Sequence, residues 1–275
     1  MEKEIISSLH NAKVRRYLLL QQKSAERREA GCFVLEGQRE LQHALAAGYE
    51  IDTLFVCPSL AGSAGSPEST GDPGNPGISG KTGLSGQVVE VTPAVYERMA
   101  YRGSTEGCAA VMRSRELRLS DLRLGEHPLI MVIESVEKPG NLGAILRSAD
   151  AAAADAVIVC DPLTDLYNPN LIRSSVGAVF TVPCVACSSA ECIAFLKDRG
   201  IQILTAQLQD SVPYYDSDMR RGTAIVMGTE ATGLTTQWRL AADAHIRIPM
   251  LGRIDSLNVS VSAAILLFEA VRQRV

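Results

Sequence analysis

The segment IRIPMLGRIDSLNVSVSAAILLFEAVR, residues 246–272, decides the fold of this chain. It begins as a short apolar strand that stops at Pro249, continues as a loop that contains Gly252, and ends in a helix. Apolar residues at i, i+3, i+4 and i+7 of that helix predict one buried stripe, made of Val261, Ala264, Ile265 and Phe268. Asn258 or Ser260 is expected to cap its first turn. Such units are usually only packing, but this loop concentrates hydroxyl and amide side chains that a structural turn does not need.

The second half of the chain, from Pro128 onward, alternates apolar strands with helices, which predicts an α/β domain with a mostly parallel sheet. The run LIMVI at 129–133 is continuously apolar, as expected for a strand that is buried on both faces. Further strands are predicted at 156–160, 182–187, 201–206, 223–228 and 244–248. Helices are predicted from about residue 141, near 170–178, at 189–198 and at 258–272.

The first 113 residues are predicted to form a small α/β module of their own. Its strands are expected at 32–37, 51–57, 88–91 and 107–112, and its helices at 5–30, 38–47 and 93–99. The charged segment 114–127 is expected to link this module to the larger domain at 128–275. An insertion at 61–87 carries glycine at every third position from Gly71 to Gly86. Because this insertion can bury little apolar area, we expect a flexible surface loop rather than a collagen-like helix.

Composition and charge restrict the class of protein. With 46% hydrophobic and 21% charged residues, the 275-residue chain is typical of globular proteins. It has no apolar run long enough to span a bilayer and no signal-peptide core at its start, so we expect a cytoplasmic protein without a membrane partner. The net charge is −4, but residues 1–30 hold seven basic side chains against four acidic ones. That segment is either an arm that contacts phosphates or a solvated amphipathic helix.

The cysteines indicate the redox compartment. Seven cysteines, an odd number without the spacing of a disulfide framework, fit a reducing cytoplasm. The spacing Cys184-x2-Cys187-x4-Cys192 resembles part of a zinc site, but no second pair of ligands faces it. We therefore predict no metal.

Three stretches of the chain, in this order, resemble the motifs of one enzyme family. They are EKPGNLGAILRSADAA at 137–152, IVMGTEATGL at 225–234, and IPM with SLNVSVSAA between 248 and 264. The segment NPNLIRSSVGAVF at 168–180 matches as well. The family is that of the SpoU/TrmH-type RNA ribose 2′-O-methyltransferases, within the SPOUT superfamily. The resemblance implies a C-terminal SPOUT domain with a trefoil knot, an N-terminal RNA-binding domain, S-adenosylmethionine as methyl donor, and a homodimer in which each subunit completes the other's site.

The helix of the first motif has two distinct faces. Its buried stripe is predicted to be Leu142, Ile145, Leu146 and Ala149. Gly140, Gly143 and Arg147 recur at i, i+3 and i+7 on another face. Two glycines beside an arginine leave room for another backbone to approach the guanidinium, and a phosphodiester suits it because arginine pairs with phosphate bidentately. The alternative for Arg147 is an exposed helix residue without a partner.

The second motif contains a glycine loop. GTEATG at 228–233 has the G-x4-G spacing of a phosphate loop, but Leu234 and Thr235 replace the lysine and hydroxyl that such a loop requires. No G-x-G-x-x-G opens a strand–helix unit, so a dinucleotide fold is unsupported. What remains is a glycine loop at the carboxyl end of a buried strand, where open α/β sheets bind ligands.

The resemblance implies roles for particular residues. The catalytic site would comprise Asn141, Arg147, Ser256, Asn258 and Glu230. The S-adenosylmethionine pocket would be lined, largely through backbone groups, by Gly228, Ile248 and Leu257. Because a ribose hydroxyl is a weak acid and arginine hardly deprotonates, we expect Arg147 to be an electrostatic anchor beside a phosphate rather than the base. Ser256 and Asn258 would orient the ribose. Glu230 either binds substrate or partner, or caps its loop.

We therefore expect an RNA ribose 2′-O-methyltransferase, most plausibly one that acts on ribosomal RNA. The N-terminal module favours ribosomal RNA, because family members that act on tRNA more often carry short helical extensions. Two alternatives stay open: a tRNA ribose 2′-O-methyltransferase, and a non-catalytic RNA-binding or ribosome-assembly protein on the same fold. The second is disfavoured because a pure binder has no need of all the motif side chains.

Overall fold

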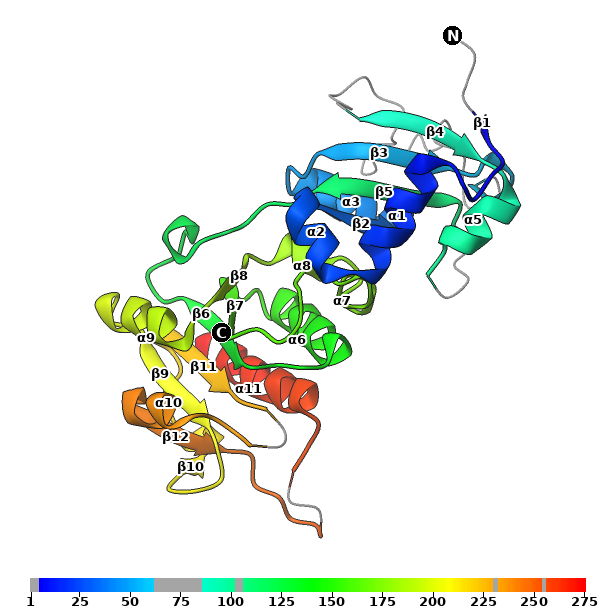
Figure 1. Ribbon diagram of the computed structural model, residues 1–275. Helices are drawn as coiled ribbons and strands as arrows, with labels where there is room; N and C mark the ends of the chain where they lie inside the picture. Colours follow the sequence, from blue (N-terminus) through cyan, green and yellow to red (C-terminus); the bar gives the residue numbers. More distant parts are fainter. Residues whose placement is uncertain (1–4, 62–85, 102–105, 230–231, 254–255) are drawn as a thin grey trace. The chain divides into compact units, whose positions relative to one another are not determined.

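The chain divides into two compact units in the computed structural model (Figure 1). The N-terminal unit comprises Met1–Arg115 and Tyr167–Arg173, and the C-terminal unit comprises Glu116–Leu166 and Ser174–Val275. The structure describes residues 5–61, 86–101, 106–229, 232–253 and 256–275. The flexible loop predicted at 61–87 therefore lies almost entirely outside the described residues.

The N-terminal unit is built on a five-stranded mixed sheet with the order β1-β4-β3-β5-β2. β4 runs parallel to β1 and β3, whereas β5 is antiparallel to β3 and β2. The strands are β1 Ile5–Ile6, β2 Cys32–Glu36, β3 Ile51–Val56, β4 Gln87–Val91 and β5 Cys108–Arg113. The helices are α1 Ala12–Gln22, α2 Ser24–Ala30, α3 Gln38–Ala46, α4 Pro58–Ala61 and α5 Pro93–Met99. The four predicted strands and the helices predicted at 38–47 and 93–99 are confirmed to within one residue at each end.

The single helix predicted over residues 5–30 is wrong. The segment forms the short strand β1 and then two helices, which are separated at Lys23, where the backbone is extended with φ −118° and ψ 118°. Arg27, which is 4% exposed, explains the break: its guanidinium donates to the carbonyl of Leu20 at 2.6 Å and to that of Gln21 at 3.3 Å. These carbonyls lie in the last turn of α1 and lack helical partners. Arg27 is therefore buried and is not available to contact RNA phosphates.

A short segment from the second half of the chain also belongs to the N-terminal unit. Tyr167 stacks on Phe33 with 4.4 Å between ring centroids, and its hydroxyl accepts the backbone N–H of Arg115 at 2.9 Å. Arg173, in α7 Pro169–Ser174, donates to the carbonyl of Tyr101 at 2.5 Å. The aromatic stacking and these two hydrogen bonds explain why residues 167–173 belong to the N-terminal unit although they are far from it in sequence.

The C-terminal unit is built on a seven-stranded sheet with the order β10-β12-β9-β11-β6-β7-β8. Every pair of neighbours in this sheet is parallel, which confirms the prediction of a mostly parallel α/β domain. The strands are β6 Leu129–Glu134, β7 Ala156–Cys160, β8 Cys184–Cys187, β9 Gln202–Ala206, β10 Val212–Pro213, β11 Thr223–Met227 and β12 Ala244–Arg247. The central strands β6, β7 and β11 are buried along their whole length, as their continuous apolar runs predict.

Helices cover both faces of this sheet (Figure 1). One face packs against α9 Ser189–Asp198 and α10 Thr236–Ala241, and the other against α6 Pro139–Ala151 and α11 Val259–Arg274. The helix predicted near 170–178 is interrupted: α7 ends at Ser174 and α8 spans Ala178–Thr181. Between them Val176 and Gly177 both have positive φ, 53° and 83°, which no continuous right-handed helix can hold. Among the described residues, no helix combines the length and the apolar character needed to cross a lipid bilayer.

The predicted buried stripe of α11 is also wrong. Val261 and Phe268 are 48% and 47% exposed. The apolar side chains that α11 buries within the chain are instead Val259, Ala263, Leu266, Leu267 and Ala270. Both sets recur at helical spacing because this helix is apolar on nearly all sides, so periodicity alone cannot choose between them. The expected cap is confirmed: the side chain of Asn258 accepts the backbone N–H of Ser260 at 2.9 Å.

Candidate functional site

The motif loops follow the carboxyl ends of strands in the C-terminal sheet. The first motif follows β6, the second follows β11, and the third follows β12. β6 and β11 are adjacent and parallel, and β12 is separated from β11 only by β9. Because the carboxyl ends of parallel strands lie at the same edge of a sheet, the three loops emerge along one edge, which is where ligands bind in open α/β sheets.

The first and third motifs are joined by a hydrogen bond between two asparagine side chains. Asn258 Nδ2 donates to Asn141 Oδ1 at 3.2 Å, although the residues are 117 positions apart. The orientation of the Asn258 amide is fixed by its oxygen, which accepts from the Ser260 N–H at 2.9 Å and from the Ser260 hydroxyl at 2.6 Å. Its nitrogen must therefore face α6. Two residues that the sequence assigns to one site are thus neighbours.

The two glycines of α6 have different surroundings, which corrects the expectation that both leave space beside Arg147. A Cβ on Gly143 would lie 2.0 Å from Ser174 Oγ and 2.8 Å from the backbone nitrogen of Ser175, so the chain itself fills this space. A Cβ on Gly140 would meet nothing within 4 Å. Only Gly140, at the start of α6, therefore leaves an open approach to the helix.

Arg147 lies two turns further along α6, on its exposed side. The predicted stripe of this helix is confirmed, because Leu142, Ile145, Leu146 and Ala149 are each fully buried. With this stripe facing the sheet, Arg147 points away from it. Its guanidinium has no hydrogen bond or ion pair with the residues that the structure describes, so its charge is available to an external anion.

The loop of the second motif is a turn closed through its own backbone. A Cβ on Gly228 would lie 2.3 Å from the carbonyl carbon of Gly233, so any side chain there would push the turn apart. The N–H of Gly233 donates to the carbonyl of Thr229 at 3.0 Å, and the hydroxyls of Thr229 and Thr232 lie 2.8 Å apart. The glycine loop predicted at the carboxyl end of β11 is therefore present. Glu230 lies outside the described residues, and its role stays a prediction.

The remaining predicted residues lie in the third-motif loop. Ile248 is half-buried, Leu257 is 37% exposed and Ser256 is exposed. They follow β12 and precede α11, so they are on the same edge as the closed turn. Their grouping with Gly228 as the wall of one pocket stays a prediction.

A buried polar network that sequence reasoning missed supports this edge. Glu134, the last residue of β6, is 2% exposed and accepts both the backbone N–H of Thr235 at 2.8 Å and its hydroxyl at 2.6 Å. Ser189 Oγ lies 3.2 Å from Glu134 and 2.6 Å from Asp161, and it accepts from the Trp238 indole at 3.0 Å. The network ties Thr235, two residues after Gly233, to the end of β6. A carboxylate that ends a continuous apolar run, as in LIMVIE, is the signal that could have revealed it.

Comparison with known sequences decides the family. The family model described as SpoU rRNA Methylase family matches residues 128–268, more than half of the chain. The chain belongs to the SpoU rRNA methylase family. The MRM3-like substrate binding domain matches residues 11–110, within the N-terminal unit.

Individual SpoU relatives agree with this membership. The chain is 35% identical over 194 residues to the 23S rRNA (guanosine-2'-O-)-methyltransferase RlmB of Ralstonia nicotianae. This match covers 68% of the chain and 78% of the Ralstonia protein. The 23S rRNA (guanosine(2553)-2'-O)-methyltransferase RlmP of Bacillus subtilis is 33% identical to the chain over 160 residues. This match covers 58% of the chain and 62% of the Bacillus protein. The crystal structure of an AdoMet-bound rRNA methyltransferase from Sinorhizobium meliloti superposes with a TM-score of 0.86 at 29% identity, over 99% of this chain and 98% of that chain.

In this SpoU family member the structure brings some predicted site residues together and leaves others apart. Asn141 and Asn258 are in contact, and Ser256 precedes Asn258 by two residues. Arg147 shares α6 with Asn141 but projects from a different side of it. The glycine turn belongs to the neighbouring strand β11. The arrangement places an amide side chain and an exposed guanidinium on α6, and on the adjoining loop a turn whose described residues carry no charge.

Proposed function

We propose that this chain transfers a methyl group from S-adenosylmethionine to a ribose 2′-oxygen in ribosomal RNA. The observation that carries the proposal is the hydrogen bond between Asn141 and Asn258, which joins the first and third SpoU motifs on the helix that also carries the exposed Arg147. The relatives named above are 23S rRNA guanosine 2′-O-methyltransferases. A protein that only bound RNA would not need two asparagines held in one fixed orientation.

The methyl donor fits the loops after β11 and β12. We assign its pocket to Gly228, Ile248 and Leu257. A closed turn without charged side chains among its described residues suits an adenosine that carries no phosphates, and the half-exposed apolar side chains of Ile248 and Leu257 offer it apolar surface. A structural relative is described as bound to AdoMet, which supports this choice of ligand. When bound, the sulfonium supplies an electrophilic methyl group.

The chain's own residues would prepare the ribose. Arg147, which is exposed, would pair with a phosphate next to the reacting nucleotide, and its positive charge would stabilise the negative charge that develops on the 2′-oxygen. Arginine cannot act as the base, because it keeps its proton in proteins. Ser256 and Asn258 would hold the ribose hydroxyls. The new C–O bond replaces the sulfonium S–C bond, and the hydroxyl proton leaves to solvent.

We infer that the active form is a homodimer. The exposed side of α11 carries Val261 and Phe268, which are 48% and 47% exposed, together with the half-buried Ala264 and Ile265. An apolar face of this kind on a helix that already buries its opposite side is typical of a subunit interface. In solution the mass should be twice that of the chain, and a strictly monomeric protein with full activity would contradict the inference.

We also propose the trefoil knot. α11 packs against α6 and against β6 and β11, whereas the strand before it, β12, lies beyond β9. Between β12 and α11 the chain therefore returns across the position of β9, which is the direction that a threaded C-terminal segment would take.

The substrate is assigned to ribosomal RNA rather than tRNA because of the N-terminal unit, which matches the MRM3-like substrate binding domain. Its first helices carry exposed basic side chains, Arg15, Lys23 and Arg28, which can contact phosphates without Arg27. We place the protein in the cytoplasm, in keeping with seven cysteines that are all free.

The experiment is to map 2′-O-methylation in total RNA from cells with and without the gene. One ribosomal RNA position should lose its methyl group in the deletion, regain it with the wild-type gene and stay unmodified with an Arg147→Ala gene. A site lost from tRNA instead would move the assignment to the tRNA alternative. An unchanged methylation map would favour a non-catalytic role.

A further inference from the structure

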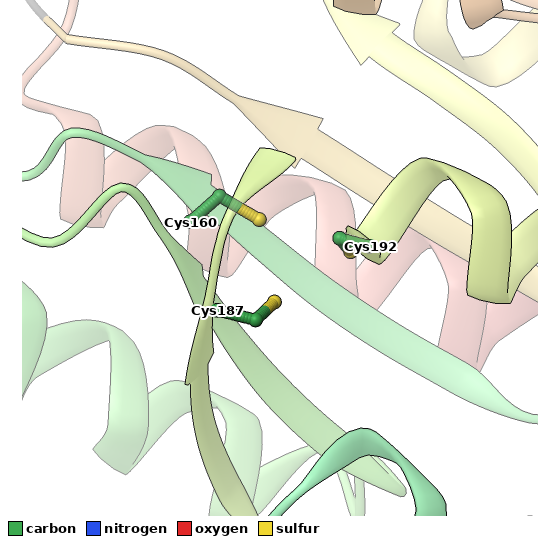
Figure 2. Close-up of side chains that lie close together, drawn as sticks. All are labelled: Cys160, Cys187 and Cys192. Atoms are coloured by element: carbon green, nitrogen blue, oxygen red, sulfur yellow. The ribbon is translucent and has the colours of Figure 1, made fainter. Parts of the chain in front are cut away.

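Three cysteines, none of them assigned to methyl transfer, converge at the carboxyl edge of the C-terminal sheet (Figure 2). Cys160 ends β7, Cys187 ends β8, and Cys192 lies in the first turns of α9. Their sulfur atoms all lie within 4.8 Å of one another. The set differs from the linear spacing in the sequence, because Cys184 takes no part and Cys160, from another strand, does.

Regular secondary structure positions each of the three side chains. Cys160 and Cys187 are directly paired in the ladder of two parallel strands, so their side chains point to the same face of the sheet. α9 covers that face, and its start is fixed by a capping box between Ser188 and Glu191. The backbone N–H of Cys192 donates to the carbonyl of Ser188 at 3.1 Å, within the first turn of that helix. Sites built on strands and helices hold their geometry better than sites on loops.

The spacing of the sulfur atoms fits a single metal ion. With Zn–S bonds of about 2.3 Å, two thiolates on one ion are about 3.8 Å apart in tetrahedral and about 4.0 Å apart in trigonal coordination. Sulfur atoms that already lie within 4.8 Å of one another need only small side-chain movements to reach these distances. A shared ion is therefore possible without any change in the sheet.

The three cysteines of the cluster differ in their exposure to solvent. Cys160 and Cys192 are fully buried, whereas Cys187 is half-buried and provides a route from solvent. Buried cysteines are often only small apolar side chains. That explanation accounts for Cys184, but it gives no reason for three sulfur atoms from three different elements to lie within 4.8 Å of one another.

We propose that Cys160, Cys187 and Cys192 form a binding site for one soft divalent cation, for which zinc is the natural candidate. Three thiolates and a divalent ion leave a net charge of −1, whereas a monovalent ion would leave −2. The smaller charge is favoured because Cys160 and Cys192 are fully buried, and burial penalises uncompensated charge. The fourth position of the ion is open to solvent beside Cys187, and the ion joins β7, β8 and α9.

Cobalt is the probe for this site, because cobalt(II) in thiolate coordination has intense charge-transfer absorption and zinc does not. The full-length protein, reduced and freed of metal, is titrated with cobalt and then with zinc. One equivalent of cobalt should bind with a thiolate charge-transfer band, and zinc should displace it. Cys187→Ala and Cys192→Ala should each weaken binding by more than about 100-fold, since loss of an outer-shell partner alone costs about 10–100-fold.

Cys184→Ala is the matched control, because Cys184 lies in the same strand as Cys187, is 8% exposed and lies outside the cluster. It should keep the full cobalt spectrum. The proposal is overturned if the wild type shows no thiolate band, or if Cys192→Ala keeps it. Should the two ligand variants fail to fold, the wild type still decides: zinc should protect Cys187 from a thiol-alkylating reagent, and an unchanged alkylation rate would refute the site.

Discussion

The contrast between the two glycines of α6 gives a sharp test of the packing around the first motif. In Gly143→Ala the new Cβ would lie 2.0 Å from Ser174 Oγ, 2.8 Å from Ser174 Cβ and 2.8 Å from the Ser175 nitrogen. The hydroxyl can rotate away, but the backbone nitrogen cannot. Overpacking should therefore lower the free energy of unfolding of the variant by about 3 kcal/mol, near the upper end of the usual range. The better helix propensity of alanine should offset about 1 kcal/mol of this loss.

The expected net loss for Gly143→Ala is about 2 kcal/mol, which corresponds to a fall in melting temperature of about 4–8 °C for a domain of this size. Gly140→Ala is the control, because its Cβ meets nothing within 4 Å and should be neutral or stabilising. The signal is the fluorescence of Trp238, the single tryptophan, which is fully buried in the C-terminal unit. Ser174→Gly in the Gly143→Ala background should restore part of the stability. A Gly143→Ala protein as stable as Gly140→Ala would refute the reasoning.

Three further predictions concern activity, assembly and pH. Arg147→Ala should lower the methylation rate by about 10²–10³-fold and change S-adenosylmethionine affinity only a few-fold, and Arg147→Lys should restore little of the rate; loss of donor binding, measured by calorimetry, would contradict it. Phe268→Glu should halve the mass measured by light scattering, whereas Leu240→Glu, on an 82% exposed residue of α10, should not. The hydrogen bond from Arg272 lowers the pKa of Glu269 in the folded protein. The ionised carboxylate therefore stabilises the fold at pH values above the pKa that it has in the unfolded chain, about 4.3. This stabilisation is lost as the pH falls through the lower pKa of the folded state. The melting-temperature gap between wild type and Glu269→Gln should accordingly be widest at neutral pH and close in acid, and a gap independent of pH would exclude this ion pair as its cause.

The sheet of the C-terminal unit could be predicted from sequence because its strands are buried on both faces. Runs such as AVIVC at 156–160 contain no polar residue, so the first and last apolar residues mark the bounds of the strand. The observed strand has the predicted bounds. The helix predicted at 189–198 is also observed with these bounds, and the structure shows that a capping box between Ser188 and Glu191 begins it. Local signals sufficed wherever one element buried one continuous apolar surface.

The failures arose where tertiary contacts choose between local options. α11 is apolar on nearly all sides, so its sequence could not say that Val261 and Phe268 lie outside the chain's own core. The break at Lys23 depends on Arg27 turning back to the carbonyls of α1. The cysteine cluster depends on the pairing of β7 with β8, which sets Cys160 beside Cys187 and leaves Cys184 out. None of these choices is visible in the spacing of residues along the chain.

The candidate site shows the same division. The motif residues Asn141 and Asn258 could be named from sequence, and the structure brings them within 3.2 Å. Glu134 was missed because a carboxylate at the end of a strand is usually solvated, although its position at the end of the apolar run LIMVIE was a signal; its burial at 2% exposure shows that it holds Thr235, two residues after Gly233.

The central claim is that the site on α6 and the third-motif loop methylates a ribose 2′-oxygen. Its most direct test is to incubate the purified protein with S-adenosylmethionine and unmodified ribosomal RNA, and to identify the products by nucleoside mass spectrometry. The account predicts one 2′-O-methylnucleoside per RNA with the wild type, and none above background with Asn141→Ala or Arg147→Ala. A methyl group on a base, or undiminished 2′-O-methylation by both variants, would contradict it.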